Sequence, residues 1–451
     1  MTPDIPLTAL VVIGVGAPAM LLAVLGVASL LNRPLPERWT GALAGSSLAL
    51  ACASLLGALV VVGATAPGAR LLSYGAWSAS HQGGIAIEFL VDRLSLAFAA
   101  LSTAIAGIVS AFSNRYLHRE PGYNRYFVLL AVFVTGMALV SLAGNIAVLF
   151  VGWELLGLSS GLLVAFFQER PAAVENAFRV LTIYRIGDAA MLSAAVLLRH
   201  VAGSDSLSLL FGRSTASTFD LSSAAATAIA VLLIVAVSCK SGLLPFSSWL
   251  PRAMEGPTPS SAVYYGSLSI HAGCFLLLRA APLLEHAPAA RILAGGVGAA
   301  TATFAAITTR VQSDVKSSLA YASLTQVGII VVEIAAGLYT IAFVHLAGHA
   351  CFRLLQFLSA PNVLHDLHGI DDAIGERSAS RAAESATSTV VRRIVFLVAL
   401  ERGFLDGILE RAVAEPFTRV ARLLTRVDRR LCDVFVPAFE PEPADRGDRD
   451  E

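Results

Sequence analysis

The residues able to do chemistry in this sequence are ionisable side chains inside long apolar stretches. Such groups are costly at membrane depth, so each is a candidate functional residue. Groups of these types exchange protons or compensate one another's charge, which is the chemistry of ion translocation. The set is Glu154, Arg185, Asp188, Lys240, His271, Glu333, His345, His349 and Arg353, with Lys316 at the start of a stretch.

Lysine is nearly absent, because the 32 basic residues include only Lys240 and Lys316. Arginine keeps its proton, whereas a buried lysine can release it. We therefore predict that Lys240 exchanges protons; the alternative is a structural ion pair. Glu154 is the expected partner of Lys240, because either charge alone would carry a large desolvation penalty. A static pair that pins two helices is the competing interpretation.

A second group repeats with helical spacing, since His345, His349 and Arg353 are four residues apart and share one helix face. Histidine titrates near neutral pH, which suits a proton relay. Packed histidines bonded to backbone carbonyls are the alternative. Arg185 and Asp188, three residues apart, could carry ions or simply neutralise each other.

The composition is that of a membrane protein. Of the 451 residues, 56% are hydrophobic and 14% are charged, with a mean hydropathy of +0.71; soluble domains have about 25% charged residues. The 32 acidic and 32 basic residues balance, which argues against nucleic-acid binding. The five cysteines are far apart, so zinc fingers, iron–sulfur clusters and disulfide frameworks are not supported. The apolar run 5–31 is too long for a signal peptide.

A membrane helix needs about 20 apolar residues. This rule predicts an all-α polytopic protein with eleven spans. Loop arginines and lysines number ten on one side and six on the other, and an Arg-rich tail lies on the first side. This bias predicts an outside N-terminus and a cytoplasmic C-terminus in the plasma (inner) membrane. The spans are 5–31, 39–63, 88–112, 124–143, 146–167, 177–201, 222–250, 258–281, 290–309, 317–337 and 338–360.

The seventh span contains helix breakers, Gly242, Pro245 and Pro251, and residues 256–259 read Gly-Pro-Thr-Pro. Proline removes a helix hydrogen bond and clashes with the preceding turn. Broken helices survive in membranes only where the freed backbone faces protein or a water-filled cavity, and transporters place ion sites there. We therefore expect a break beside Lys240.

The chain changes character after the last span. Residues 366–390 are polar, and 391–433 alternate apolar and charged positions at helical spacing. Such a helix lies on a membrane surface or against a partner. We expect residues 434–451, which are acidic, to be disordered. The apolar stripe comprises Phe417, Val420, Leu423, Leu424, Val427 and Leu431.

Five segments, 151–160, 184–188, 240–259, 314–328 and 345–349, resemble the antiporter-like subunits shared by respiratory complex I and Mrp-type cation/proton antiporters. The resemblance implies that Glu154 and Lys240 are the family's glutamate–lysine pair. It also implies that Lys316, His345 and His349 belong to the central hydrophilic axis.

Three features depart from the family pattern. Tyr265 stands where a histidine is common, and Arg353 where a lysine is common. The first broken-helix repeat is intact, whereas the second lacks its lysine-bearing broken helix. The resemblance thus implies 1–123 as N-terminal helices, 124–281 as the first repeat, 282–365 as a partial second repeat, 366–433 as a linker with amphipathic cytoplasmic helices, and 434–451 as a tail.

Segments 166–171, 266–273 and 352–366 look like the membrane subunit of the dissolved inorganic carbon pump, DabB or MpsA. This resemblance implies a cation-conducting subunit in the bilayer that drives CO2 hydration in a large cytoplasmic zinc partner similar to β-carbonic anhydrase. No cofactor, metal site or catalytic centre is then expected in this chain. The alternatives are a proton-pumping subunit of NADH-quinone oxidoreductase or an Mrp Na+/H+ antiporter, and a membrane anchor with a degenerate channel.

Overall fold

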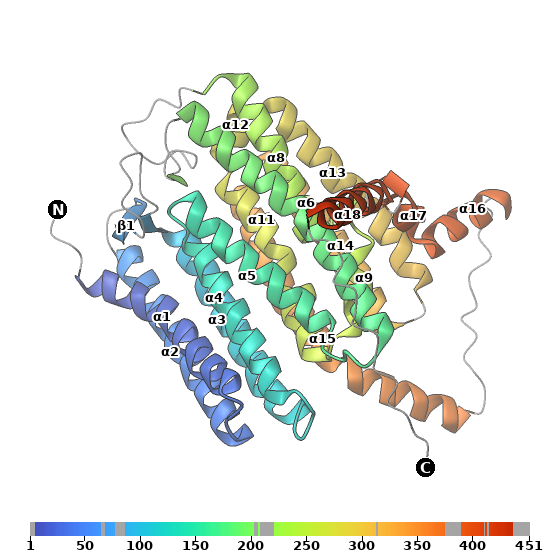
Figure 1. Cartoon of the computed structure of the whole chain (residues 1–451). Coiled ribbons are helices and arrows are strands. Elements are labelled where there is room, and N and C mark those ends of the chain that lie inside the picture. Colours follow the sequence, from blue (N-terminus) through green and yellow to red (C-terminus); the bar gives the residue numbers. More distant parts are fainter. Residues whose placement is uncertain are drawn as a thin grey trace, which may run out of the picture. The chain divides into compact units, whose positions relative to one another are not determined.

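The computed structural model describes residues 5–64, 68–76, 86–202, 206–207, 221–312, 314–374, 389–409, 411–412 and 415–435 (Figure 1). These residues form two compact units, one up to Leu400 and one from Glu401 onward. The first unit holds every candidate site residue named above.

The described chain contains eleven helices long and apolar enough to cross a membrane, which confirms the predicted fold class. The eighth span is assembled from α10, η2 and α11, and the ninth adds a 3₁₀ turn, η3 (Thr309–Val311), to the end of α13. The long helices of the spans are α1 (Ile5–Leu30), α2 (Glu37–Ala64), α3 (Arg93–Tyr116), α4 (Tyr123–Leu142), α5 (Ile146–Val164), α6 (Pro171–Ala202), α8 (Ser223–Ser241), α13 (Pro288–Thr308), α14 (Val315–Ala336) and α15 (Tyr339–Ile374).

The third span begins later than expected, because residues before it form a hairpin. Strands β1 (Arg70–Ala76) and β2 (Ala86–Val91) pair antiparallel. Asp92 then ends the strand and caps α3, since its carboxylate accepts a hydrogen bond from the Ser95 backbone N–H at 2.8 Å. This cap is a strong helix start signal.

The seventh span is broken beside Lys240, as predicted. α8 ends at Ser241, and Gly242 adopts a left-handed conformation with φ +69°, which favours glycine. The chain resumes as α9 (Trp249–Arg252) and a 3₁₀ turn, η1 (Ala253–Glu255). The Trp249 indole donates to the carbonyl of Cys239 at 3.0 Å, so a carbonyl in the last turn of α8 has a protein partner.

The eighth span is the most buried segment of the described chain. It consists of α10 (Thr258–Ser260), a π-helix η2 (Ser261–Leu268) and α11 (Ser269–Arg279), and all of these residues are buried. A π-helical stretch changes which residues face a given side, and such stretches are frequent at functional sites. The short helix α12 (Ala281–His286) follows.

Two helix pairs are packed through glycines. Gly136 of α4 faces Gly152 of α5 so closely that a Cβ on Gly152 would lie 2.8 Å from the Gly136 carbonyl. In the α13–α14 pair, a Cβ on Gly298 would lie 2.7 Å from the Gly328 carbonyl. Small residues at such crossings let helix backbones approach.

The last span ends where predicted, because the membrane-crossing stretch of α15 is Tyr339–Ala360. The helix itself continues to Ile374, and α16 (Thr389–Leu400) packs against α13. In the second unit, η4 (Arg402–Phe404) and α17 (Leu405–Leu409) precede α18 (Glu415–Phe435). The helical prediction for the tail is confirmed. Residues 375–388 and 436–451, with most of the predicted disordered segment, lie outside the described residues.

The apolar stripe of α18 is exposed where its side chains are described, at Val420, Leu423, Leu424 and Val427. Phe417 and Leu431 belong to the same helix.

Candidate functional site

Glu154 and Asp188 share one arginine rather than meeting Lys240 directly. Arg185 Nη2 lies 2.6 Å from Glu154 Oε2 and 2.8 Å from Asp188 Oδ2. Arg185 and Asp188 are one turn apart on α6, and Glu154 reaches them from α5. We call Glu154, Arg185 and Asp188 the arginine-bridged cluster. The expected direct contact between Glu154 and Lys240 is therefore not formed, because the guanidinium, with its fork of donors, binds both carboxylates.

Lys240 lies beside this cluster in the last turn of α8, and its side chain is 1% exposed. Its ammonium donates to the Trp153 carbonyl at 3.1 Å and lies 4.8 Å from the Trp153 ring and 4.2 Å from the Tyr184 ring. Among the described residues, no carboxylate forms an ion pair with it. Aromatic faces and a carbonyl thus hold this cation in place of a counterion.

Gly157 makes room for the lysine, since a Cβ at this position would lie 3.0 Å from Lys240 Nζ. The sequence reasoning missed Gly157, Trp153 and Tyr184. A signal did exist, because Gly157 lies three residues after Glu154 and therefore shares its helix face.

Tyr265 is the residue that the resemblance places where a histidine is common. It is fully buried and its hydroxyl donates to the Ser160 carbonyl at 3.0 Å. The Ser160 hydroxyl lies 3.0 Å from the Tyr265 oxygen and 3.3 Å from the Tyr184 oxygen. A row of hydroxyls therefore extends from the aromatic wall around Lys240 toward η2.

A second polar group, which we call the histidine line, joins α11 to α15. Arg353 Nε donates to His349 Nε2 at 3.0 Å, and His349 Nδ1 lies 2.9 Å from His271 Nε2. Arginine only donates, so His349 Nε2 must accept and its hydrogen must lie on Nδ1. His349 then donates to His271, and the line runs in one direction, from Arg353 to His271.

His345 continues this face of α15, and its ring centroid lies 6.4 Å from that of His349. Its Nδ1 is 2.9 Å from Glu333 Oε1 and its Nε2 is 3.0 Å from Gln326 Oε1, both on α14. The shared face of His345, His349 and Arg353 is confirmed. The partners of the two histidines are side chains, not the backbone carbonyls of the alternative interpretation.

Lys316 is set apart from both groups. It is half-buried at the start of α14, and its ammonium donates to the Gly256 carbonyl at 3.3 Å. Among the residues with described positions, no cluster of three or more His, Cys, Asp or Glu side chains could hold a metal ion.

The two polar groups can do different things. In the first, two carboxylates and two cations balance when all are ionised, so a proton that arrives on a carboxylate leaves one positive charge in excess. In the second, the Arg353 guanidinium fixes which nitrogen of His349 carries the hydrogen, so the two imidazoles form a hydrogen-bonded line of one direction beside a cation. Each group lies on helices of the membrane unit, where solvating water is scarce.

Comparisons with known proteins give two family matches. Residues 143–386 match the family "NADH:quinone oxidoreductase/Mrp antiporter, TM", and residues 77–127 match "NADH-Ubiquinone oxidoreductase (complex I), chain 5 N-terminus". NADH-quinone oxidoreductase subunit L of Mycobacterium tuberculosis is 34% identical over 337 residues, which are 70% of this chain and 52% of that protein. NAD(P)H-quinone oxidoreductase chain 5 of Picosynechococcus sp. is 32% identical over 67% of this chain and 45% of its own length.

The fold has close counterparts among solved structures. The Mrp complex from Dietzia sp. contains a chain with a TM-score of 0.65 and 28% identity, covering 83% of this chain and 38% of that one. A chain of the membrane-bound sulfane sulfur reductase, an archaeal respiratory complex, has a TM-score of 0.68 at 19% identity, covers 77% of this chain and 70% of its own length, and shows the fold alone. The chain spans about half the length of the curated relatives it matches. Because the family model covers more than half of its residues, this chain belongs to the NADH:quinone oxidoreductase/Mrp antiporter family of multi-pass membrane proteins.

Proposed function

We propose that this chain conducts protons as a membrane subunit of a larger energy-coupled complex, in the manner of NADH-quinone oxidoreductase or an Mrp antiporter. The observation that carries the proposal is Lys240, a buried amine at a helix break, held by a carbonyl and two rings rather than by a carboxylate. Arg185 already forms ion pairs with both nearby carboxylates. Both carboxylates would therefore keep their direct partner when Lys240 loses its proton.

The proposed cycle follows from the charges. With all four groups ionised the region is balanced. A proton taken up by Glu154 leaves an excess positive charge close to Lys240, and repulsion at low dielectric is strong. Release of the lysine proton restores the balance. Transfer of the Glu154 proton to Lys240 then returns both groups to their ionised forms, so uptake and release on opposite sides of Lys240 would move one proton per cycle.

Exposure of the cluster supports assembly with another membrane chain. Arg185 is 54% exposed and Glu154 28% exposed in the isolated chain, halfway along two spans. Charges at that depth do not face lipid without large cost. We therefore infer that a helix of a partner subunit covers α5 and α6 at this point.

The narrower carbon-pump role, with its zinc-binding carbonic-anhydrase-like partner, is supported by three sequence motifs, whereas the matched relatives carry respiratory and antiporter names. Purification of the native complex followed by mass spectrometry separates these roles. Respiratory or Mrp subunits would support the role that we favour, and a large zinc protein would replace it with the carbon pump.

Substitution of Lys240 tests conduction itself. In the reconstituted native complex, we expect Lys240→Arg and Lys240→Ala each to reduce proton uptake, followed with a pH-sensitive dye in the vesicle lumen, at least about tenfold, because arginine keeps the charge but cannot release a proton. Arg33→Lys, a charge-conserving change in an exposed loop, should leave uptake unchanged. Full activity of Lys240→Arg would reduce the lysine to a fixed countercharge and contradict the proposal.

We further propose that the protein lies in the plasma membrane with its N-terminus outside. The basis is the excess of basic residues in one set of loops. A reporter enzyme that is active only in the cytoplasm should then be active when it is fused after Asp366. Activity of a reporter that works only in the periplasm would contradict this orientation.

A further inference from the structure

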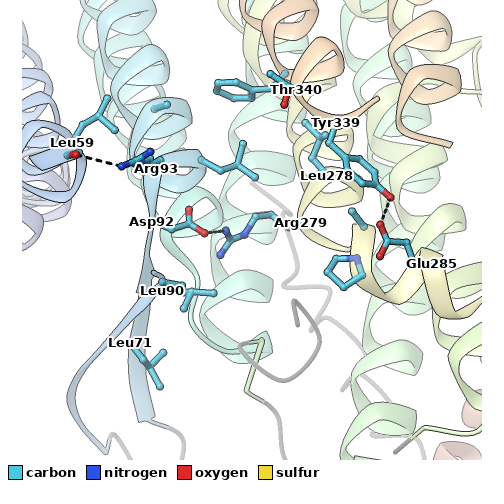
Figure 2. Close-up of a pocket in the computed structure, with 17 residues that line it drawn as sticks. Leu59, Leu71, Leu90, Asp92, Arg93, Leu278, Arg279, Glu285, Tyr339 and Thr340 are labelled. Carbon is cyan, nitrogen blue, oxygen red and sulfur yellow. Dashed lines mark hydrogen bonds and ion pairs between the residues drawn. The ribbon is translucent and has the colours of Figure 1, made fainter. Parts of the chain in front are cut away.

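The charged groups around one cavity of the membrane unit already have partners within the chain (Figure 2). The cavity measures about 950 Å³, and its lining includes ends of α2, α3, α11 and α15. Asp92 and Arg279 form a buried ion pair in its wall. Glu285 accepts a hydrogen bond from the Tyr339 hydroxyl at 2.8 Å, and Arg93 donates to a carbonyl at the end of α2 at 3.3 Å. Because the chain itself holds these four charges, the cavity does not single out a ligand. The exposed surface of α18 is more specific.

The apolar stripe of α18 is aliphatic and exposed where its side chains are described. Val420, Leu423, Leu424 and Val427 are between 46% and 62% exposed. Their spacing of three or four residues places them on one side of the helix. Amphipathic helices gain most of their stability by burying such a face. The stripe therefore needs an apolar environment to cover it.

Arginines occupy another side of α18, next to the stripe. Arg422 and Arg426 are four residues apart and exposed, and Arg419, also exposed, contacts Glu415 at 3.0 Å. The helix has three acidic residues, Glu415, Asp428 and Asp433, and no lysine. It thus has an excess of positive charge. The five arginines are Arg419, Arg422, Arg426, Arg429 and Arg430.

The helix before α18 in the membrane unit, α16, indicates that the chain is still at the bilayer at this point. Its residues 394–398 are Ile, Val, Phe, Leu and Val, and each is at least 39% exposed. Five consecutive helical residues point to all sides, so this part of α16 is apolar all round, as in helices surrounded by hydrocarbon. Its 12 residues are too few to cross the bilayer.

The link from α16 to α18 is short. α16 ends at Leu400 and α18 begins at Glu415. A link of about 15 residues reaches at most about 50 Å even when it is fully extended. The bilayer surface is therefore always within reach of α18, which raises its effective concentration there.

We propose that α18 binds the surface of an anionic phospholipid bilayer. The apolar stripe enters the boundary between head groups and hydrocarbon, and the arginines bind lipid phosphates, which match their planar donors. Apolar burial and attraction to anionic lipids add up in helices of this kind. An acidic soluble protein would match the arginines alone, whereas a bilayer surface offers an apolar and an anionic layer side by side. The inference does not depend on proton conduction.

The test measures amide hydrogen exchange of α18 by mass spectrometry, with the purified full-length chain in lipid nanodiscs. One set of nanodiscs contains phosphatidylcholine alone, and the other an equimolar mixture of phosphatidylcholine and phosphatidylglycerol. An amphipathic helix without a covered face opens readily, so its amides are protected when it binds. We expect exchange in α18 to be at least about tenfold slower in the anionic nanodiscs, because each arginine near an anionic surface contributes about fivefold.

Two variants separate charge from apolar burial. Arg422→Gln should reduce the difference between the two nanodiscs about fivefold, and Arg422→Lys should restore most of it. Leu424→Gln keeps every charge but weakens the stripe, so the protection in anionic nanodiscs should fall. Arg33→Gln, in the exposed loop between α1 and α2, is the matched control and should leave exchange in α18 unchanged.

Equal exchange of α18 in both kinds of nanodisc, or a difference that neither Arg422→Gln nor Leu424→Gln alters, would overturn the proposal. Protection that is found only in the native complex, and not with the purified chain in anionic nanodiscs, would assign this surface to another protein.

Discussion

The arginine-bridged cluster and the histidine line each contain one arginine, Arg185 and Arg353, and the two arginines have different partners. Arg185 contacts two carboxylates, and with Lys240 nearby the charges of that region cancel. Arg353 is 7% exposed and donates to His349 and Gln356, both neutral groups, and no carboxylate among the described residues forms an ion pair with it. In one region the arginine contacts carboxylates directly, whereas in the other the carboxylate, Glu333, contacts His345 and not Arg353.

This difference shows that the same residue type can serve as a counterion or as a source of repulsion. A proton on His349 would be repelled by Arg353, which lies within hydrogen-bonding distance. A proton on Glu154 instead meets a region that can respond by releasing one. We infer that the first region accepts protons readily, whereas the second opposes a cation at its centre.

The largest expected effect comes from removing each arginine in turn. Arg185→Gln leaves two carboxylates without their shared partner, and we expect a loss of about 3 kcal/mol, the lower end for a broken buried pair because Arg185 is half exposed. Arg353→Gln removes an uncompensated charge and should cost less than about 1 kcal/mol. Thermal unfolding of both purified variants in detergent measures the difference. Equal destabilisation would show that the two arginines have the same role.

A smaller loss of stability is expected from substitutions near either region, because each region includes a helix that packs against a neighbour through glycines. Gly152→Ala and Gly328→Ala place a methyl group against a backbone carbonyl and should each cost about 1–3 kcal/mol. Gly296→Ala, on a part of α13 with open space around it, should be neutral or stabilising through helix propensity. The same unfolding assay applies. Tolerance of both substitutions would mean that the helix pairs can separate without strain.

The smallest effect concerns space beside the titratable groups. A methyl group at Gly157 would lie 3.0 Å from the Lys240 ammonium, whereas Gly348, next to His349, has nothing within 4 Å of its ideal Cβ. We expect Gly157→Ala to reduce proton uptake about threefold to tenfold, or about 1 kcal/mol, by displacing the ammonium from its carbonyl and rings. Gly348→Ala should leave uptake unchanged. If Gly157→Ala is fully active, the lysine does not need its observed position.

Much of the architecture was predictable, because membrane spans depend on local composition. Eleven spans, the break after Lys240 and the amphipathic α18 all follow from runs of apolar residues, proline and glycine positions, and helical spacing. The boundaries were less accurate. The span expected from residue 88 begins at Arg93, because a β-strand is as apolar as the helix that follows it.

Sequence reasoning also found most of the site residues, since a charge inside an apolar run stands out. It placed Glu154, Lys240 and the residues of α15 in the membrane and on shared helix faces. The resemblance to antiporter-like subunits was confirmed at the level of the family. Each of these conclusions needs only the sequence of a single helix.

The tertiary structure alone decided which groups meet. Glu154 forms an ion pair with Arg185 rather than with Lys240. His271 of α11 lies within hydrogen-bonding distance of His349 of α15, 78 positions later in the sequence. Periodicity determines which side of a helix a residue occupies, but the partner depends on how helices cross and on where a glycine leaves room. The sequence by itself thus determined which charged residues lie within membrane spans. The packing of the helices determined which of these residues contact one another.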